Sequence, residues 1–199
     1  MMKFYARVVA FFTLFVAAIA CAQETPDALV RKTVDDVLAV IKQTRDQRKL
    51  TEIAETKVLP YFDFKRMTRL AVGRHWSQAS ATQQEALERA FRTLLVRTYT
   101  VSLASSTGEA KVVVKPSALK PGDEETTVKT VATEPGRQPI QIDYRMARMP
   151  DGWKVYDVVV DNLSLVTNYR GSFQSEIARS GIDGLIKAIE AKNQKTAEG

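Results

Sequence analysis

The period of the hydrophobic pattern changes twice along this chain, and these changes limit the folds that it can adopt. Before residue 110 the apolar residues recur at helical spacing, and one such stripe consists of Val30, Val34, Val37, Leu38 and Ile41. From residue 110 to about 163 they alternate with polar residues, as strands do. Helical spacing then returns. This order predicts an α+β fold in which several helices cover one face of a curved, four-stranded antiparallel sheet.

Local signals set the expected boundaries. We predict helices over 26–46, 50–59, 64–72 and 80–103, and strands over 110–116, 124–134, 138–149 and 152–163. Asp63 is expected to cap the third helix and Gly73 to end it, while Ser80 and Gln83 have the spacing of a capping box. Ser164 is expected to cap a helix that Gly181 separates from a last, shorter one.

The first 22 residues have the three parts of a secretory signal peptide. A basic start with Lys3 and Arg7 precedes an apolar run over 8–19 and the small residues Ala20 and Ala22. We expect cleavage after Ala22, which leaves residues 23–199 as a single domain with a candidate small helical subdomain within 50–80. Two alternatives stay open: a retained membrane anchor, and a lipoprotein that is lipidated at Cys21.

The cysteine count and the charge limit the disulfides and the partners that the sequence predicts. Cys21 is the only cysteine, so the expected mature chain has no disulfide. The chain has 29 basic and 23 acidic residues, and removal of Lys3 and Arg7 lowers its net charge from +6 to +4. Because the basic residues are scattered, the sequence gives no support for nucleic-acid binding.

Two acids accompany the valine-rich run 155–160: Asp157 lies within it and Asp161 follows it directly. Four residues apart on a strand, they would be about 13 Å from each other, wider than the roughly 5–9.5 Å of glycosidase carboxylate pairs unless a bulge intervenes. We therefore expect no catalytic pair. We predict that Asp157 lies near a base of a neighbouring strand and that Asp161 begins the turn before the capped helix.

The usual marks of an enzyme are sparse. His75 is the only histidine, and the chain has no HExxH, GxSxG or GxGxxG motif. We therefore predict no catalytic residue, metal site or cofactor. The sheet and the helices instead carry many apolar side chains, which either fill a core or surround an apolar cavity. Composition does not decide between the two.

Three long segments resemble the MlaC family, also called the toluene-tolerance auxiliary family. They are PYFDFKRMTRLAVGRHW (60–76), SATQQEALERAFRTLLVRTY (80–99) and GWKVYDVVVDNLSLVTNYRGSFQSEIARSGIDGLIKAI (152–189). The resemblance extends in order from about residue 25 to 193. Asn162 departs from it, because the family pattern has glycine at that position.

The resemblance implies a periplasmic phospholipid carrier on a cone-shaped, NTF2-like α+β fold with an apolar cavity. Such a carrier holds lipid as cargo and needs no cofactor. Its implied partners are an outer-membrane lipoprotein–porin complex and an inner-membrane ABC transporter with an MCE domain. The implied role is the maintenance of outer-membrane lipid asymmetry, and we expect a monomer.

The alternation of the strands and the resemblance together predict the lipid pocket. Its expected residues are Phe64, Met67, Leu70, Phe91, Leu94, Leu95, Tyr99, Val112, Val114, Ile140, Ile142, Tyr144, Tyr156, Val158, Val160, Leu165, Val166, Tyr169 and Phe173. Arg170 is expected at the surface, near a head group or a partner. Two rival hypotheses stay open: an enzyme that uses Asp143 or Asp157 as general base beside a tyrosine, and a periplasmic scaffold with a filled core.

Overall fold

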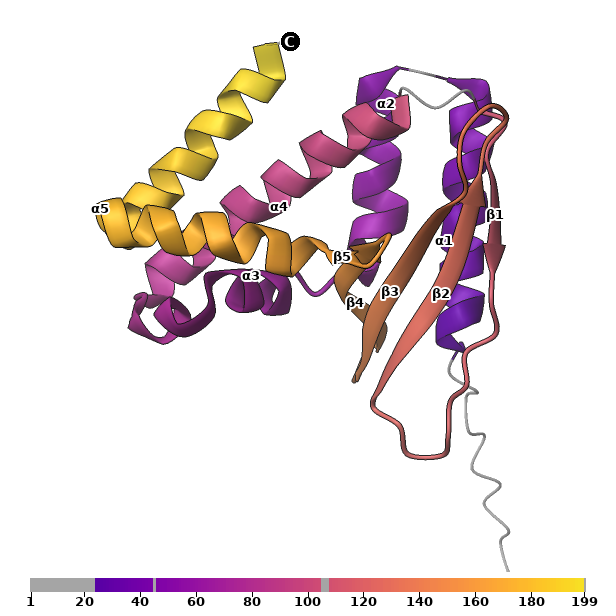
Figure 1. Cartoon of the computed structure of the whole chain (residues 1–199), viewed down its shortest axis with the longest axis horizontal. Coiled ribbons are helices and arrows are strands. Elements are labelled where there is room, and N and C mark those ends of the chain that lie inside the picture. Colours follow the sequence, from indigo (N-terminus) through magenta and orange to yellow (C-terminus); the bar gives the residue numbers. More distant parts are fainter. Residues whose placement is uncertain (1–23, 45, 105–107, 199) are drawn as a thin grey trace, which may run out of the picture.

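The computed structural model describes residues 24–44, 46–104 and 108–198 (Figure 1). The predicted signal peptide and Cys21 lie outside these residues. Helix α1 (Pro26–Gln43) begins after Thr25, whose side chain accepts a hydrogen bond from the backbone N–H of Ala28. The sequence places Pro26 at the first position of the helix, where its missing N–H costs nothing.

The second predicted helix is shorter and less regular than expected. Helix α2 (Gln47–Ile53) begins earlier than predicted because the Asp46 carboxylate accepts hydrogen bonds from the N–H groups of Arg48 and Lys49. It passes into a π-helical turn, η1 (Ala54–Val58), and a 3₁₀ turn, η2 (Leu59–Tyr61). The chain therefore bends at this segment instead of continuing as one helix to Pro60.

The predicted caps of the next two helices are confirmed. Asp63 accepts a hydrogen bond from the Arg66 N–H at 2.8 Å at the start of α3 (Phe64–Val72), and Gly73 ends that helix with a φ of 63°. After the 3₁₀ turn η3 (Gly73–Gln78), helix α4 (Ala81–Ala104) opens with a capping box. In this box the Gln83 side chain accepts from Ser80 N–H and the Ser80 hydroxyl accepts from Gln83 N–H.

The sheet is an antiparallel meander with the order β1-β2-β3-β4-β5. Its strands are β1 (Lys111–Val114), β2 (Glu125–Thr133), β3 (Ile140–Met149), β4 (Gly152–Val160) and β5 (Leu163–Ser164). The described residues thus form five strands, and the prediction of four is corrected. The fifth was missed because it has only two residues, which pair with β4 across the tight turn of Asp161 and Asn162.

The C-terminal helix α5 (Leu165–Glu198) bends at Gly181, where φ is 72° and ψ is −175°. This position is where the sequence predicted a break between two helices. At the start of α5, the Ser164 hydroxyl accepts a hydrogen bond from the Thr167 N–H at 3.0 Å, so the predicted cap is also confirmed.

These elements form two groups, each with its own hydrophobic core (Figure 1). Helices α3, α4 and α5 pack on one another around a helical core that includes Met67, Leu87, Phe91, Leu94, Phe173, Ile177 and Leu185. Helix α1 packs on the sheet around a sheet core that includes Leu29, Val30, Val128, Met146, Trp153, Val155 and Val158. The space between the two cores is where the candidate site lies.

Candidate functional site

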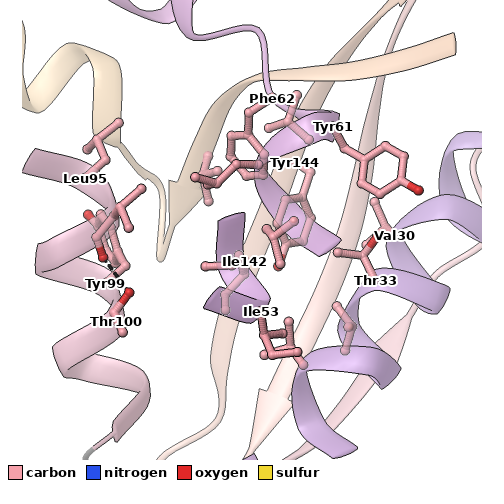
Figure 2. Close-up of a pocket in the computed structure, with 18 of the residues that line it drawn as sticks. Val30, Thr33, Ile53, Tyr61, Phe62, Leu95, Tyr99, Thr100, Ile142 and Tyr144 are labelled. Carbon is pink, nitrogen blue, oxygen red and sulfur yellow. Dashed lines mark hydrogen bonds between the residues drawn. The ribbon is translucent and has the colours of Figure 1, made fainter. Parts of the chain in front are cut away.

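An apolar pocket of about 390 Å³ lies between the helical core and the sheet core. Figure 2 shows α4 on one side of it, with Leu95, Tyr99 and Thr100, and α1 on the other, with Val30 and Thr33. Ile142 and Tyr144 of β3 line its sheet wall, and Ile53 of α2 and Phe62 complete it. The volume falls within the range of about 300–1,000 Å³ that is usual for small-molecule sites.

The few polar groups of the lining are neutral, and several are already satisfied by the protein. The Thr33 hydroxyl donates to the Leu29 carbonyl at 2.9 Å, and the Thr100 hydroxyl donates to the Val96 carbonyl at 2.7 Å. The described lining contains no charged side chain. Its chemistry is therefore suited to an apolar ligand.

Two tyrosines of the lining stay protonated at neutral pH and well above it. Burial raises the pKa of Tyr144 to about 12, and burial followed by the neighbouring Tyr169 raises the pKa of Tyr99 to about 12. Neither hydroxyl is therefore ready to act as a base near neutral pH. Both tyrosines present an apolar ring and a neutral hydroxyl to the pocket.

A β-bulge decides which residues of β4 face the pocket. Arg145 of β3 pairs with Asp157, but the next residue, Met146, pairs with Val155, which leaves Tyr156 without a partner. The extra residue reverses the alternation, so that Val155 lies on the same side of the sheet as Val158. Tyr156 points to the opposite side.

Asp157 is buried on that opposite side and is fully engaged. One carboxylate oxygen accepts from Arg145 at 3.2 Å and from the Ser164 hydroxyl at 2.7 Å, and the other accepts from the Val166 N–H at 3.2 Å. The prediction that Asp157 lies near a base of a neighbouring strand is confirmed. Asp161 sits in the predicted turn, where its side chain accepts from the Gln141 N–H.

Comparison with known protein families assigns this chain to one of them. The family model described as MlaC protein matches residues 31–191, which is most of the chain. The chain belongs to the MlaC family.

Two relatives extend this result. A curated MlaC-family relative from Haemophilus influenzae, the intermembrane phospholipid transport system binding protein MlaC, is 22% identical over 178 residues, covering 86% of this chain and 83% of the relative. A solved structure of the phospholipid-binding protein from Ralstonia solanacearum, in complex with a phospholipid, superimposes with a TM-score of 0.79. It is 36% identical and covers 86% of this chain and 98% of its own.

Part of the set predicted from the MlaC-family resemblance lines this pocket. These residues are Phe64, Met67, Leu95, Tyr99, Val112, Ile142, Tyr144, Val158, Val160 and Leu165. They come from α3, α4, the three strands β1, β3 and β4, and the start of α5, so the fold brings together residues that are up to about 100 positions apart. That they contact lipid stays a prediction.

The remaining residues of the predicted set lie elsewhere. Leu70, Phe91, Leu94, Val166, Tyr169 and Phe173 belong to the helical core, where their rings and side chains pack on one another and not on the pocket. Val114 is buried in the sheet core, and Ile140 is 38% exposed at the start of β3. Tyr156 faces outward because of the bulge, and its hydroxyl donates to Glu125 at 3.0 Å.

Arg170 is exposed, as predicted for a surface residue, but it does not line the pocket. Its Nε donates to the Leu70 carbonyl at 2.9 Å, which ties the start of α5 to α3. His75 lies in η3, where its Nδ1 is 3.1 Å from the Gln78 side-chain oxygen. The described residues place both side chains in contacts within the helical group.

The wall contributed by α1 and α2 was missed by sequence reasoning. It includes Leu29, Val34, Val37, Leu38, Ile41, Leu50 and Ile53. The stripe of α1 was recognised as apolar, but its spacing alone does not tell a face that covers a core from one that covers a pocket.

Over the described residues, none of the helices combines the length and the apolar character that are needed to cross a membrane. In the same part of the chain, no three His, Cys, Asp or Glu side chains gather in a way that would hold a metal ion.

Proposed function

We propose that this protein is a phospholipid carrier that buries acyl chains in the pocket between the helical core and the sheet core. The observation that carries the proposal is the apolar, uncharged lining of that pocket in a chain that is 36% identical to a phospholipid-binding protein solved with a phospholipid. The family and the name of the Haemophilus influenzae relative support a role in transport between membranes.

The energetics of such a site favour the tails over the head group. Each methylene that leaves water contributes about 0.8 kcal/mol, so a single acyl chain outweighs the few hydrogen bonds that a head group makes at a solvated surface. Since the lining has no charged side chain, we expect weak discrimination between head groups. Selectivity would then depend on the shape and length of the pocket.

We further propose that the carrier works in the periplasm. Residues 1–22 would be removed on export, and residues 23–199 would form the lipid-binding domain as a monomer. It would exchange lipid with an outer-membrane lipoprotein–porin complex and with an inner-membrane ABC transporter that carries an MCE domain, and so maintain outer-membrane asymmetry. Because water does not accept the tails, release requires a partner that offers an equally apolar path.

The enzyme hypothesis requires a carboxylate inside the pocket. Asp157 faces away from it and is held by Arg145 and Ser164, and Asp143 lies on the same outward face beside Gln141. Neither acid lines the pocket. These positions favour a carrier over general-base chemistry.

Native mass spectrometry of the purified chain 23–199 tests the proposal, followed by extraction and identification of any bound lipid. We expect a phospholipid adduct at stoichiometric occupancy. If the protein still shows no adduct after incubation with phospholipid vesicles, the result would contradict the proposed function. Protein that is stripped of lipid and then incubated with vesicles is the matched control. An adduct on this protein shows that the lipid was taken up from the vesicles and was not retained from purification.

A further inference from the structure

A second hollow of about 170 Å³ lies next to the main pocket. Its lining consists of Glu24, Leu29, Tyr61, Asp151, Gly152 and Trp153. Two of these residues, Leu29 and Tyr61, also line the main pocket. They therefore separate the two spaces, and we refer to Leu29 and Tyr61 as the partition.

The partition lies across the pocket from the most exposed of its described lining residues. Among the described lining residues, Tyr99 is the one that reaches the exposed class, at 36% exposure. Figure 2 shows Tyr99 on α4 and Tyr61 beside the α1 wall, on opposite sides of the pocket. Leu29 is 5% exposed. A chain that enters near Tyr99 would therefore reach the partition last.

The backbone on both sides of Tyr61 is fixed to β4. The Lys154 ammonium donates to the Pro60 carbonyl at 2.7 Å, and the Asp63 N–H donates to the Val155 carbonyl at 2.9 Å. Phe62, the residue after Tyr61, also pairs with Val155 in an isolated parallel bridge. These bonds hold the segment beside the strand, so the backbone that carries the Tyr61 ring is anchored to β4.

The two sides of the partition differ in chemistry. The main pocket is uncharged, whereas the second hollow is bordered by the carboxylates of Glu24 and Asp151, and Asp151 pairs with Lys154 at 2.9 Å. An acyl chain that passed the partition would leave an apolar space for a polar one. Only the part of the hollow beside Trp153 and Leu29 offers it apolar contact.

We propose that Tyr61 and Leu29 set the longest acyl chain that this protein accepts, because they close the pocket at the end opposite Tyr99. This inference rests on the proposed function and adds to it a determinant of chain length. Removal of the Tyr61 ring would join the two spaces. The joined pocket would then accept longer chains without a change at the head-group end.

The test uses vesicles that contain equal amounts of dimyristoyl-, dipalmitoyl- and distearoyl-phosphatidylglycerol. These lipids share a head group and differ only in chain length. Delipidated chain 23–199 is incubated with them, and native mass spectrometry gives the occupancy by each lipid. For Tyr61→Ala we expect the ratio of distearoyl to dipalmitoyl adduct to rise at least about fourfold over wild type, the factor for one further buried methylene at about 0.8 kcal/mol.

Two control variants test whether enlargement of the pocket alone, or loss of the Tyr61 hydroxyl alone, changes the length ratio. Tyr99→Ala removes the same ring at the other end and should leave the length ratio within about twofold of wild type. Tyr61→Phe keeps the ring and should leave the ratio unchanged. A folded Tyr61→Ala protein with the wild-type ratio would overturn this inference while the proposed function stands. A wild-type protein that takes up none of the three lipids would instead remove the proposed function.

A measurement on the wild-type protein keeps the inference testable if Tyr61→Ala does not fold. A phosphatidylglycerol with a photoactivated diazirine at the end of one acyl chain is bound, irradiated and mapped by peptide mass spectrometry. We expect crosslinks to Leu29, Tyr61 or Phe62. Crosslinks confined to Tyr99 and Thr100, on the α4 side of the pocket, would overturn the assignment of the partition.

Discussion

Asp157 accepts a hydrogen bond from the Val166 N–H at 3.2 Å, and this contact joins the valine-rich strand β4 to the first turn of α5. The same carboxylate accepts from Ser164, whose hydroxyl caps α5. A buried acid in an apolar strand is thus explained by the helix that follows the strand. Its negative charge also lies at the helix N-terminus, where the helix dipole favours an anion.

Replacement of Asp157 by alanine should destabilise the fold. The change leaves the Val166 N–H and the Ser164 hydroxyl without their acceptor in a buried region, so we expect the free energy of unfolding to fall by about 1–3 kcal/mol. Urea unfolding followed by far-UV circular dichroism measures it. Asp143→Ala is the matched control, since Asp143 bonds only the Gln141 side chain at the surface, and it should change stability by less than about 0.5 kcal/mol.

Filling the pocket from its sheet wall should expel lipid without unfolding the protein. Val158 and Val160 line the pocket, and a tryptophan at either position would occupy space that we assign to acyl chain. Displacement of two methylenes at about 0.8 kcal/mol each would weaken binding roughly fifteenfold. Lipid occupancy by native mass spectrometry gives the result. Val113→Trp, on a 60% exposed position of β1, is the control. Full occupancy in a folded Val158→Trp protein would show that β4 does not line the lipid site.

The order of helices and strands could be predicted from the sequence because it depends on local signals. The caps at Asp63, Ser80 and Ser164 and the stops at Gly73 and Gly181 act within a few residues, so their spacing is visible in the chain. The fifth strand was missed for the complementary reason. A segment of two residues is too short to show the alternation of apolar and polar residues. Its pairing depends on a turn that folds it back on β4.

The site was harder to predict because it depends on register and on long-range packing. Strict alternation along β4 placed Tyr156 in the pocket, but the bulge beside Arg145 reverses the alternation at this residue. The helical core explains why several other residues of the predicted set do not line the pocket. Phe91 and Phe173 are apolar aromatic residues of the kind expected in a lipid site. Their rings instead pack edge to face, with centroids 5.2 Å apart. Nothing in the sequence reveals that the protein builds two cores with a pocket between them.

Acid should weaken one link between α3 and the sheet. The hydrogen bond from Arg66, and a second from Tyr156, lower the pKa of Glu125 from its ordinary value of 4.5, and the Arg66–Glu125 distance is 2.6 Å. A lowered pKa means that this contribution is present above about pH 4.5 and is lost as the pH falls through the folded-state pKa. Since Glu125 is about half exposed, we expect only about 0.2–1 kcal/mol.

The comparison of Glu125→Gln with wild type isolates this contribution. Urea unfolding at pH 7 should give a less stable variant, and the difference should shrink as the pH falls through the lowered folded-state pKa of Glu125, because the wild-type carboxylate then becomes protonated too. Glu124→Gln, on the neighbouring exposed residue, should follow the wild-type curve. A difference between Glu125→Gln and wild type that stays constant with pH would mean that the contact acts by packing alone, through the Arg66 guanidinium that lies 3.6 Å from the centre of the Tyr156 ring.

The turn between β4 and β5 should accept glycine at Asn162 but not a β-branched residue. Asp161 and Asn162 have φ values of 45° and 66°, as a two-residue hairpin turn with a left-handed backbone requires. Asparagine tolerates this conformation, because its short polar side chain can form local hydrogen bonds. We expect Asn162→Gly to change the free energy of unfolding by less than about 0.5 kcal/mol. Asn162→Val should lower it by roughly 1–2 kcal/mol, because a side chain that branches at Cβ is sterically unfavourable at positive φ. Equal stability of the two variants in urea unfolding would show that this turn opens at little cost and that β5 is not needed to position α5.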